Sequence, residues 1–417
     1  MKVLTVNTSE STGGAAVAAK RLTEALNNNG VKARMLVADK HSDTLYVSSC
    51  GSRMRYKAAF VVERAAIWIN NLFSRKNLFA VSTACAGVDI TQTPEFKEAD
   101  IIHLHWINQG LLSLKGIRKI INSGKPIVWT MHDMWECTAI CHHAHTCDKY
   151  TEECRECPML RFPGRHDLAH RTFVRKRAML DGAHIHFVAV SRWLADRARS
   201  GALLQGMPVH VIPNSLSVGK FAVLDRQECR AALGIKNKYV VASGAARIDT
   251  PIKGFHFLKE ALARLVGRHG YAKSDICLLL FGAIRDRSIL DDMPTEYLHV
   301  GSVSGERALS RIYSAADALV SSSLYETFGQ TLIEAQACGC LPVSFNNSGQ
   351  TDIIRHKENG FLAEYQSADD LAAGIDWSFK ADIPRERLRD EAHRRFSESA
   401  VAGKYIDIYN ELINEKA

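Results

Sequence analysis

The stretch SSSLYETFGQTLIEAQACGCLPV, residues 321–343, decides the fold of the second half of the chain. A strand-like run ends in small residues, a helix is expected to begin near Gly329 and to end near Gly339, and the strand-like LPVSF follows. This succession is typical of a parallel sheet covered by helices.

Two carboxylates accompany this helix. Glu326 precedes its start and Glu334 lies within it. The amides of a first helical turn have no internal acceptors, so together with the helix dipole they favour anionic or polar oxygens. A carboxylate accepts hydrogen bonds from sugar hydroxyls but repels a diphosphate. The pattern therefore predicts a ligand that has both phosphate and hydroxyl groups, a nucleotide sugar.

With Glu326 and Glu334 separated by seven residues, the sequence resembles the glycosyltransferases of family 4. The resemblance implies that Glu326 and the amides after it hold the donor sugar, and that Glu334 binds the ribose hydroxyls. The implied donor-binding residues after Glu326 are Thr327, Phe328, Gly329 and Gln330. Two surface glutamates beside a helix start are the structural alternative.

A second match lies in SGAARIDTPIKGFHFL, residues 243–258. Arg247 and Lys253 follow a strand and precede a helix, and the resemblance implies that they bind the donor phosphates. Their task would be to neutralise charge on the leaving diphosphate, an electrostatic role that often supplies the largest catalytic contribution. Thr250 and Pro251 depart from the usual loop, and an ordinary surface Arg and Lys remain the alternative.

Strand and helix patterns alternate along all 417 residues, a length that suggests two or three domains. The resemblance implies an α/β chain of the GT-B fold, with two doubly wound Rossmann-like domains facing a central cleft. We expect an acceptor-binding domain at 1–215, a nucleotide-sugar-binding domain at 216–390, and a C-terminal helix within 391–417 that returns to the first domain. The family motif usually has Gly where Ser215 stands.

In the first domain, Gly13 and Gly14 separate the first strand from the first helix, where absent side chains let a backbone approach a ligand. The spacing is not G-x-G-x-x-G, which counts against a dehydrogenase.

His132 ends the strand-like IVWTMHD, and the resemblance places it beside donor and acceptor; a histidine of the domain interior is the alternative. Asp133 could orient His132 only if the strand has ended. We expect His103 and His105 to serve packing or the cleft wall.

Five of the eleven cysteines lie between residues 137 and 157. A C-x-x-C pair presents two thiolates to one tetrahedral zinc. We predict a structural zinc in a Cys-rich insertion at about 136–160, and free thiols or disulfides are the alternatives. The stretch is similar to that of bacterial colanic-acid and capsule glycosyltransferases. The predicted ligands are Cys141, Cys147, Cys154 and Cys157.

Composition favours an ordinary globular chain, with 46% hydrophobic and 24% charged residues. A net charge of +8 indicates anionic ligands or an anionic membrane surface rather than a nucleic-acid partner. No apolar run is long enough to span a membrane and the start does not resemble a signal peptide, so we expect a cytoplasmic protein. The basic segment 54–79 has two interpretations: a helix packed on its own domain, or a surface that touches anionic lipid at the inner face of the membrane.

The sequence therefore predicts a retaining glycosyltransferase of bacterial surface polysaccharide biosynthesis. It would move a sugar from a nucleoside diphosphate to a glycan or lipid-linked acceptor. No Asp-x-Asp motif ends a strand, so we expect catalysis without a metal cofactor. The alternatives are a nucleotide-sugar epimerase or phosphorylase of the same fold, and a catalytically silent, zinc-stabilised scaffold protein.

Overall fold

The computed structural model describes residues 1–416 and divides into two compact units. The N-terminal unit contains Met1–Ser215 and the C-terminal residues from Val401, and the C-terminal unit is Leu216–Ala400. The chain therefore changes unit at residue 400, later than the boundary of 390 that the sequence suggested. The reason is α12 (Arg385–Phe396), whose Glu391 forms an ion pair of 2.6 Å with Arg355 of the C-terminal unit.

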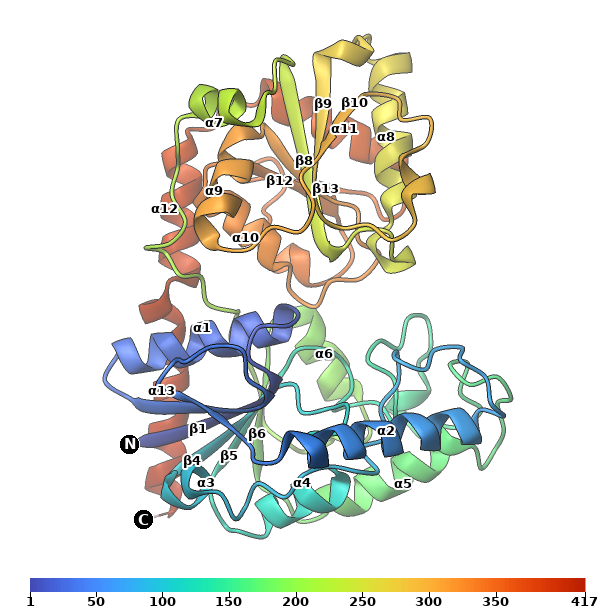
Figure 1. Ribbon diagram of the computed structural model, residues 1–417, viewed down its shortest axis with the longest axis vertical. Coiled ribbons are helices and arrows are strands. Elements are labelled where there is room, and N and C mark those ends of the chain that lie inside the picture. The colour runs from blue at the N-terminus through green and yellow to red at the C-terminus, as the bar shows by residue number, and fades with distance from the viewer. Residues whose placement is uncertain (417) are drawn as a thin grey trace. The chain divides into compact units, whose positions relative to one another are not determined.

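The N-terminal unit is built on a seven-stranded parallel sheet of order β3-β2-β1-β4-β5-β6-β7. The strands are β1 (Lys2–Ser9), β2 (Lys32–Asp39), β3 (Val47–Ser49), β4 (Ile101–Leu104), β5 (Ile127–Met131), β6 (Ile185–Ala189) and β7 (Val209–Val211). Figure 1 shows this sheet with its helices in the blue and green part of the chain.

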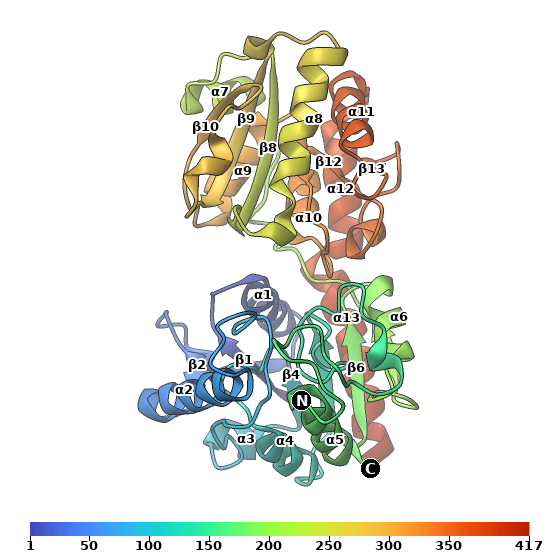
Figure 2. The same ribbon diagram turned by 90° about the vertical axis from the view of Figure 1, so that its right-hand side faces the viewer.

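Helices cover both faces of this sheet. They are α1 (Gly14–Asn28), α2 (Arg53–Asn70), α3 (Pro94–Glu98), α4 (Leu114–Ile121), η1 (Lys149–Thr151), α5 (Leu168–Leu180), α6 (Arg192–Ser200) and α13 (Glu398–Lys416). One core cluster joins α1 and α13 to the strands, with Leu22, Val128, Val188 and Tyr409 fully or almost fully buried. Residues from Val401 onward thus complete the N-terminal unit, as Figure 2 shows for α13.

The C-terminal unit contains a six-stranded parallel sheet of order β10-β9-β8-β11-β12-β13. The strands are β8 (Tyr239–Arg247), β9 (Ile276–Ala283), β10 (Glu296–His299), β11 (Ala318–Ser321), β12 (Leu341–Phe345) and β13 (Phe361–Ala363). The α-helices are α7 (Arg226–Leu233), α8 (Phe255–Arg268), α9 (Glu306–Ala315), α10 (Gln330–Ala337), α11 (Ala368–Lys380) and α12. The 3₁₀ turns are η2 (Pro251–Lys253), η3 (Lys273–Asp275), η4 (Arg287–Leu290) and η5 (Gly349–Asp352).

A single core cluster holds the C-terminal sheet to α8 and α11, with Val241, Leu262, Leu278 and Ile375 fully buried. These near-continuous apolar strands are typical of parallel sheets that helices cover on both faces. The predicted pair of doubly wound Rossmann-like sheets is confirmed. Among the described residues, no helix is both long enough and apolar enough to cross a membrane.

Candidate functional site

The charged candidate residues of the C-terminal unit, Arg247, Lys253 and Glu326, lie at or after the carboxyl ends of β8 and β11. The two strands are neighbours, so the loops after them meet at one edge of the sheet. Lys253 in η2 lies with its Nζ 2.6 Å from Oε1 of Glu326. Both side chains are partly exposed at 30% and 21%, so solvent and small solutes reach the ion pair.

The loop that carries Lys253 is fixed to the loop after β11 by backbone contacts. Leu324 donates its amide to the carbonyl of Ile252, and the Ser322 hydroxyl donates to the carbonyl of Lys253. Gly254 has φ +59°, and a Cβ there would lie 2.2 Å from the carbonyl oxygen of Ser322. Only glycine permits this close approach. Backbone contacts between the two loops therefore fix the position of Lys253.

Arg247 ends β8 and donates to Asp249 at 3.0 and 3.2 Å. The hydrogen bond from Arg247 lowers the pKa of the Asp249 carboxyl to about 2. Of the two residues that depart from the family pattern, Pro251 begins the one-turn η2 and Thr250 is its N-cap, with its hydroxyl donating to the carbonyl of Arg247. We call Arg247, Asp249, Lys253 and Glu326 the charged edge.

Residues 327–330 lead into α10, whose N-cap Gly329 offers no side chain to the first-turn amides. Gly349 donates its amide to the Glu326 carbonyl, and its Cα position is so close to Thr327 that a Cβ would lie 2.1 Å from the Thr327 carbonyl oxygen. The Phe328 side chain is buried and packs edge to face on Phe396. Because its ring is buried, Phe328 can contact a ligand at this loop only through its backbone.

Glu334 lies on α10 and is 6% exposed. Its Oε2 accepts a hydrogen bond of 2.9 Å from the hydroxyl of Tyr313 on α9. Tyr313 was not anticipated from the sequence. A buried phenol bonded to a buried carboxylate fixes the orientation of the carboxylate, because moving either group would leave a polar atom unsatisfied.

In the N-terminal unit, Gly13 and Gly14 connect β1 to α1. Gly13 has φ +89°, and open space surrounds the Cβ position of both glycines. The preceding Glu10 is buried, and its carboxylate accepts hydrogen bonds from Lys20 Nζ at 2.8 Å and from the amides of His41 and Ser42. Burial raises the pKa of Glu10, but these bonds outweigh it and lower the pKa to about 2. Glu10 thus anchors the loop between strand and helix.

His132 directly follows β5, and His105 directly follows the neighbouring β4. Nδ1 of His105 lies 2.9 Å from Nε2 of His132, and the two rings are stacked. His103, two residues earlier on β4, contacts His105 with ring centroids 4.2 Å apart. We call His103, His105 and His132 the histidine cluster. We expected His103 and His105 to serve packing or the cleft wall; in the structure His105 also bonds to the candidate residue His132.

Side chains of α13 and β5 bond to His103 of the histidine cluster. Nδ1 of His103 accepts from or donates to the Tyr409 hydroxyl at 2.6 Å, and its Nε2 lies 2.8 Å from Oγ1 of Thr130. Burial lowers the pKa of His103 to about 3. Burial also lowers the pKa of His132 to about 4, although the charge of Asp133 acts in the opposite direction. At neutral pH the cluster is therefore uncharged.

The Asp133 carboxylate bonds to three groups other than the His132 ring. It accepts from Trp106 Nε1 at 2.8 Å, from the amide of Trp135 at 2.8 Å, and bonds to His142 Nδ1 at 2.7 Å. β5 ends at Met131, so the condition for Asp133 to orient His132 is met, but the Asp133 carboxylate is bonded to these three groups and His132 contacts His105 on the neighbouring strand. Asp133 instead fixes the start of the Cys-rich segment.

The four candidate zinc ligands line one small cavity of about 20 Å³ between residues 138 and 169. The fifth cysteine of the segment, Cys137, lies apart from that lining and its thiol donates to the carbonyl of Met134. No three His, Cys, Asp or Glu side chains within residues 1–416 are arranged, as they stand, so that they could hold a metal ion. The zinc site therefore stays a prediction. The cavity is lined by Cys141, Cys147, Cys154 and Cys157.

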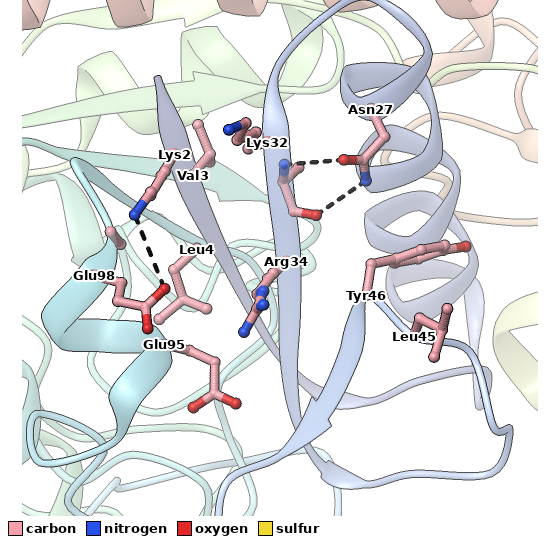
Figure 3. A pocket seen from close by; sticks show the side chains of 12 residues that line it. Lys2, Val3, Leu4, Asn27, Lys32, Arg34, Leu45, Tyr46, Glu95 and Glu98 are labelled. Atoms are coloured by element: carbon pink, nitrogen blue, oxygen red, sulfur yellow. Dashed lines mark hydrogen bonds and ion pairs between the residues drawn. The ribbon is translucent and has the colours of Figure 1, made fainter.

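A larger cavity of about 480 Å³ in the N-terminal unit lies elsewhere (Figure 3). It is lined by the first residues of β1 and β2 and by α3, at the edge of the sheet opposite to Gly13 and His132. Its side chains are engaged with one another: Lys2 pairs with Glu98 at 4.0 Å, and Asn27 bonds to the backbone of Ala33. Ligands of open parallel sheets bind at the carboxyl ends of strands, so this cavity is not part of the candidate site.

Two family models match the chain over most of its length. Residues 12–219 match "Glycosyltransferase Family 4" and residues 225–395 match "Glycosyl transferases group 1". A curated relative that aligns over both chains is the putative colanic acid biosynthesis glycosyl transferase WcaC of Escherichia coli, 24% identical over 99% of this chain and 100% of its own. The lipopolysaccharide core biosynthesis glycosyltransferase LpsE of Rhizobium meliloti is 30% identical over 40% of this chain and 54% of its own. The chain spans about half the length of several other curated relatives that it matches.

Solved structures share the fold at low identity. Anabaena HepE, solved in complex with UDP and glucose, superposes with a TM-score of 0.63 at 16% identity and covers 99% of this chain and 100% of its own. Sucrose-phosphate synthase from Thermosynechococcus elongatus gives a TM-score of 0.68 at 18% identity, with 99% of both chains covered. With two parallel Rossmann-like sheets and both family models matched in order, the chain belongs to the family 4 glycosyltransferases of the GT-B fold.

Proposed function

We propose that the protein is a retaining glycosyltransferase that transfers a sugar from a nucleoside diphosphate to a hydroxyl of a glycan or lipid-linked acceptor in bacterial surface polysaccharide biosynthesis. The observation that carries the proposal is the contact of 2.6 Å between Lys253 and Glu326 beside the start of α10. A cation and a carboxylate held together at a helix start suit a ligand that offers both phosphate and hydroxyl oxygens. The putative glycosyl transferase WcaC, the glycosyltransferase LpsE and HepE, solved with UDP and glucose, agree with this class of reaction and donor.

In the proposed reaction, the bond between the anomeric carbon and the β-phosphate oxygen breaks, and its electron pair leaves on the phosphate. Arg247 and Lys253 stabilise that charge, a role that needs no metal cofactor. The acceptor hydroxyl attacks from the face that the phosphate leaves, and its proton passes to the departing phosphate oxygen. Retention follows without a carboxylate nucleophile.

The remaining residues position the donor. Glu326 accepts hydrogen bonds from the sugar hydroxyls, and the amides of residues 327–330 donate hydrogen bonds to the sugar. Glu334, oriented by Tyr313, accepts from the ribose hydroxyls. His132 has its pKa lowered to about 4 by burial. It is therefore a neutral hydrogen-bonding group beside the sugar, and not the proton donor of the reaction.

A thermal-shift panel of UDP, GDP, ADP and dTDP with their common sugars tests the donor. A ligand present at a hundred times its Kd adds about 2.7 kcal/mol to the stability of the folded protein. We expect one nucleotide class to raise Tm, and Glu334→Ala to abolish the shift. Glu260→Ala, on the exposed surface of α8, is the matched control and should keep it. If no nucleotide raises Tm and no donor is turned over, the silent scaffold replaces the transferase.

The structural zinc is tested separately. We expect about one equivalent of zinc in protein purified without added metal, and loss of that zinc in Cys154→Ser. Cys229→Ser removes a buried cysteine of α7 and should leave the metal content unchanged. Zinc below about one-tenth of an equivalent, with reactive thiols in the segment, would exclude the zinc site.

A further inference from the structure

The outer surface of α2 and the turn after it is apolar. Of the thirteen exposed large hydrophobic side chains within residues 1–416, eight fall in the 26 residues from Met54 to Phe79. Seven of these eight are at least 54% exposed, and Trp68 is 38% exposed. A monomeric soluble protein seldom gathers so many in one place without a partner. The eight are Met54, Val61, Val62, Trp68, Ile69, Leu72, Phe73 and Phe79.

Five of the eight side chains lie on α2 and form one stripe along it. At about 100° per residue, positions 54, 61, 62, 68 and 69 fall within an arc of roughly 120°. The opposite side, with Ala59, Glu63 and Ile67, is buried against the unit. One face of the helix therefore packs against its own unit, and a second, apolar face is exposed. Figure 2 shows the helix at the edge of the N-terminal unit.

The turn after α2 holds its apolar side chains outward by defined contacts. Leu72 and Phe73 have φ of 47° and 59°, a conformation that bulky residues adopt at a cost. The ring of Phe73 stacks edge to face on Trp68, with ring centroids 4.8 Å apart. Asn71 is buried and fixes the turn, because its side chain donates to the Lys76 carbonyl and accepts from the amide of Arg161. The exposed rings are therefore part of an ordered surface.

Basic side chains border this apolar stripe. In the helical projection Arg55 and Lys57 lie on its two sides, and Arg53, Arg75 and Lys76 stand at its ends; all five are exposed. The one acidic residue of 53–79, Glu63, is buried, paired with Arg64 at 3.1 Å, and accepts from the amides of Thr83 and Ala84. The exposed surface of the segment thus carries positive charge that no acidic side chain of the segment neutralises.

A second basic segment adjoins the first. Arg171 of α5 donates to Asn70 at 2.6 Å, and the exposed Phe162 lies beside Arg161. In the neighbouring Cys-rich segment, Glu156 pairs with Lys149 and Glu153 with Arg155, whereas Asp148 and Glu152 are exposed. The apolar stripe and its basic border therefore continue from α2 to the start of α5.

We propose that this surface docks the protein on an anionic lipid bilayer. Apolar side chains flanked by arginine and lysine match the interface between acyl chains and anionic headgroups, where the rings enter the boundary and the cations remain with the phosphates. Each such cation is attracted to an anionic surface, and salt weakens this attraction. A second copy of the same chain would place these positive charges against each other, and charge complementarity therefore favours the bilayer. The inference does not depend on the proposed transfer reaction.

Co-sedimentation with vesicles tests the proposal. The full chain should bind vesicles of phosphatidylcholine with about 30% phosphatidylglycerol, bind pure phosphatidylcholine at least about tenfold more weakly, and dissociate at about 0.5 M salt. The variant Val62→Ser/Ile69→Ser/Phe73→Ser and the variant Arg55→Gln/Lys57→Gln/Lys76→Gln should each lower binding by tenfold or more. These residues are exposed, so the variants should keep the wild-type Tm.

Matched controls remove similar side chains elsewhere. Leu45→Ser/Tyr297→Ser removes exposed apolar residues, and Lys236→Gln/Lys273→Gln/Arg287→Gln removes the same charge from the C-terminal unit. Both controls should bind vesicles like the wild type. If the controls lose binding as much as the α2 variants do, the attraction is a property of net charge and the proposal is wrong.

Quenching of Trp68 by brominated lipids gives a readout of contact. Quenching in the wild type that is lost in Trp68→Phe supports insertion of this surface. No binding to anionic vesicles at low salt, or quenching unchanged in Trp68→Phe, overturns the proposal. A dimer in sedimentation equilibrium that the Val62→Ser/Ile69→Ser/Phe73→Ser variant disrupts would also overturn it and assign the surface to a second copy.

Discussion

The charged edge of the C-terminal unit and the histidine cluster of the N-terminal unit stand at corresponding ends of two similar sheets, yet they treat charge in opposite ways. In the charged edge, Lys253 and Glu326 are partly exposed and lie 2.6 Å apart as a salt bridge. In the histidine cluster, burial lowers the pKa values of the imidazoles and keeps them neutral. One sheet edge is thus suited to hold a charged ligand, whereas the other offers hydrogen bonds without charge.

The supports of the two regions differ as well. The charged edge depends on backbone contacts between neighbouring loops, at Gly254 and Ser322. The histidine cluster depends on side chains from a distant part of the chain, because Tyr405 bonds to Thr130 and Tyr409 to His103. Local substitutions should therefore disturb the charged edge by changing the geometry of its loops, and the histidine cluster by changing the burial of its imidazoles.

The largest expected effect concerns the charged edge. Lys253→Ala and Glu326→Ala should each lower turnover by a hundredfold or more, since one preorganised transition-state contact contributes about 2.7 to 4 kcal/mol. Steady-state kinetics with the donor found by thermal shift measures this. Lys380→Ala breaks another lysine–carboxylate pair, with Asp376 on α11, and should keep wild-type turnover. Near-normal rates in Lys253→Ala would remove the charged edge from catalysis.

The next effect tests the neutrality of the histidine cluster. A histidine whose pKa is lowered by folding stabilises the native state above its unfolded pKa of about 6.5, and this stability is lost as the pH falls toward the native value. With native pKa values of about 3 for His103 and about 4 for His132, each should cost about 2 kcal/mol at pH 5.

Urea denaturation at pH 7 and pH 5, followed by tryptophan fluorescence, measures this loss. Trp106, Trp129 and Trp135 report on the N-terminal unit. Burial raises the pKa of Glu136 well above its usual range, so Glu136 acts in the opposite direction over this interval, and a histidine variant is needed to isolate the histidine contribution. His103→Asn should reduce the loss between the two pH values. A loss of stability between the two pH values that is the same in His103→Asn as in the wild type would contradict the assignment of a buried, neutral His103.

A smaller effect separates backbone geometry from side-chain chemistry. Gly254→Ala should destabilise the C-terminal unit by about 1 kcal/mol or more, because φ is positive there and the new Cβ meets the Ser322 carbonyl. Gly267→Ala, in α8 with open space around it, should stabilise by roughly 0.5 to 1 kcal/mol. Calorimetry compares the two. If both substitutions are neutral, the backbone contact does not hold Lys253 in place.

The smallest effect concerns Tyr313. Tyr313→Phe deletes the hydroxyl that donates to Glu334 and should weaken nucleotide binding by about three- to tenfold, in line with a net hydrogen-bond contribution of about 0.5 to 1.5 kcal/mol. Isothermal titration with the nucleotide measures the change. Unchanged affinity would mean that Glu334 is oriented without Tyr313.

Some features follow from sequence alone. Strand and helix periods, with glycines at the turns, predict two parallel sheets because such patterns report which residues must be buried. The same patterns place Arg247, Lys253 and Glu326 after strands, and parallel neighbours bring the ends of such strands to one edge. The signal for His105 was also present: His103 and His105 alternate on the strand that precedes His132, and period two places them on one face.

Other features were decided by the tertiary structure. The pairings of Tyr405 with Thr130 and of Tyr409 with His103 join residues 275 and 306 positions apart, and no local pattern specifies contacts of that range. The same holds for the outward face of α2. Its residue types indicated an amphipathic helix, but only packing determines which of two apolar faces is covered, because burial is a property of the surroundings and not of the segment.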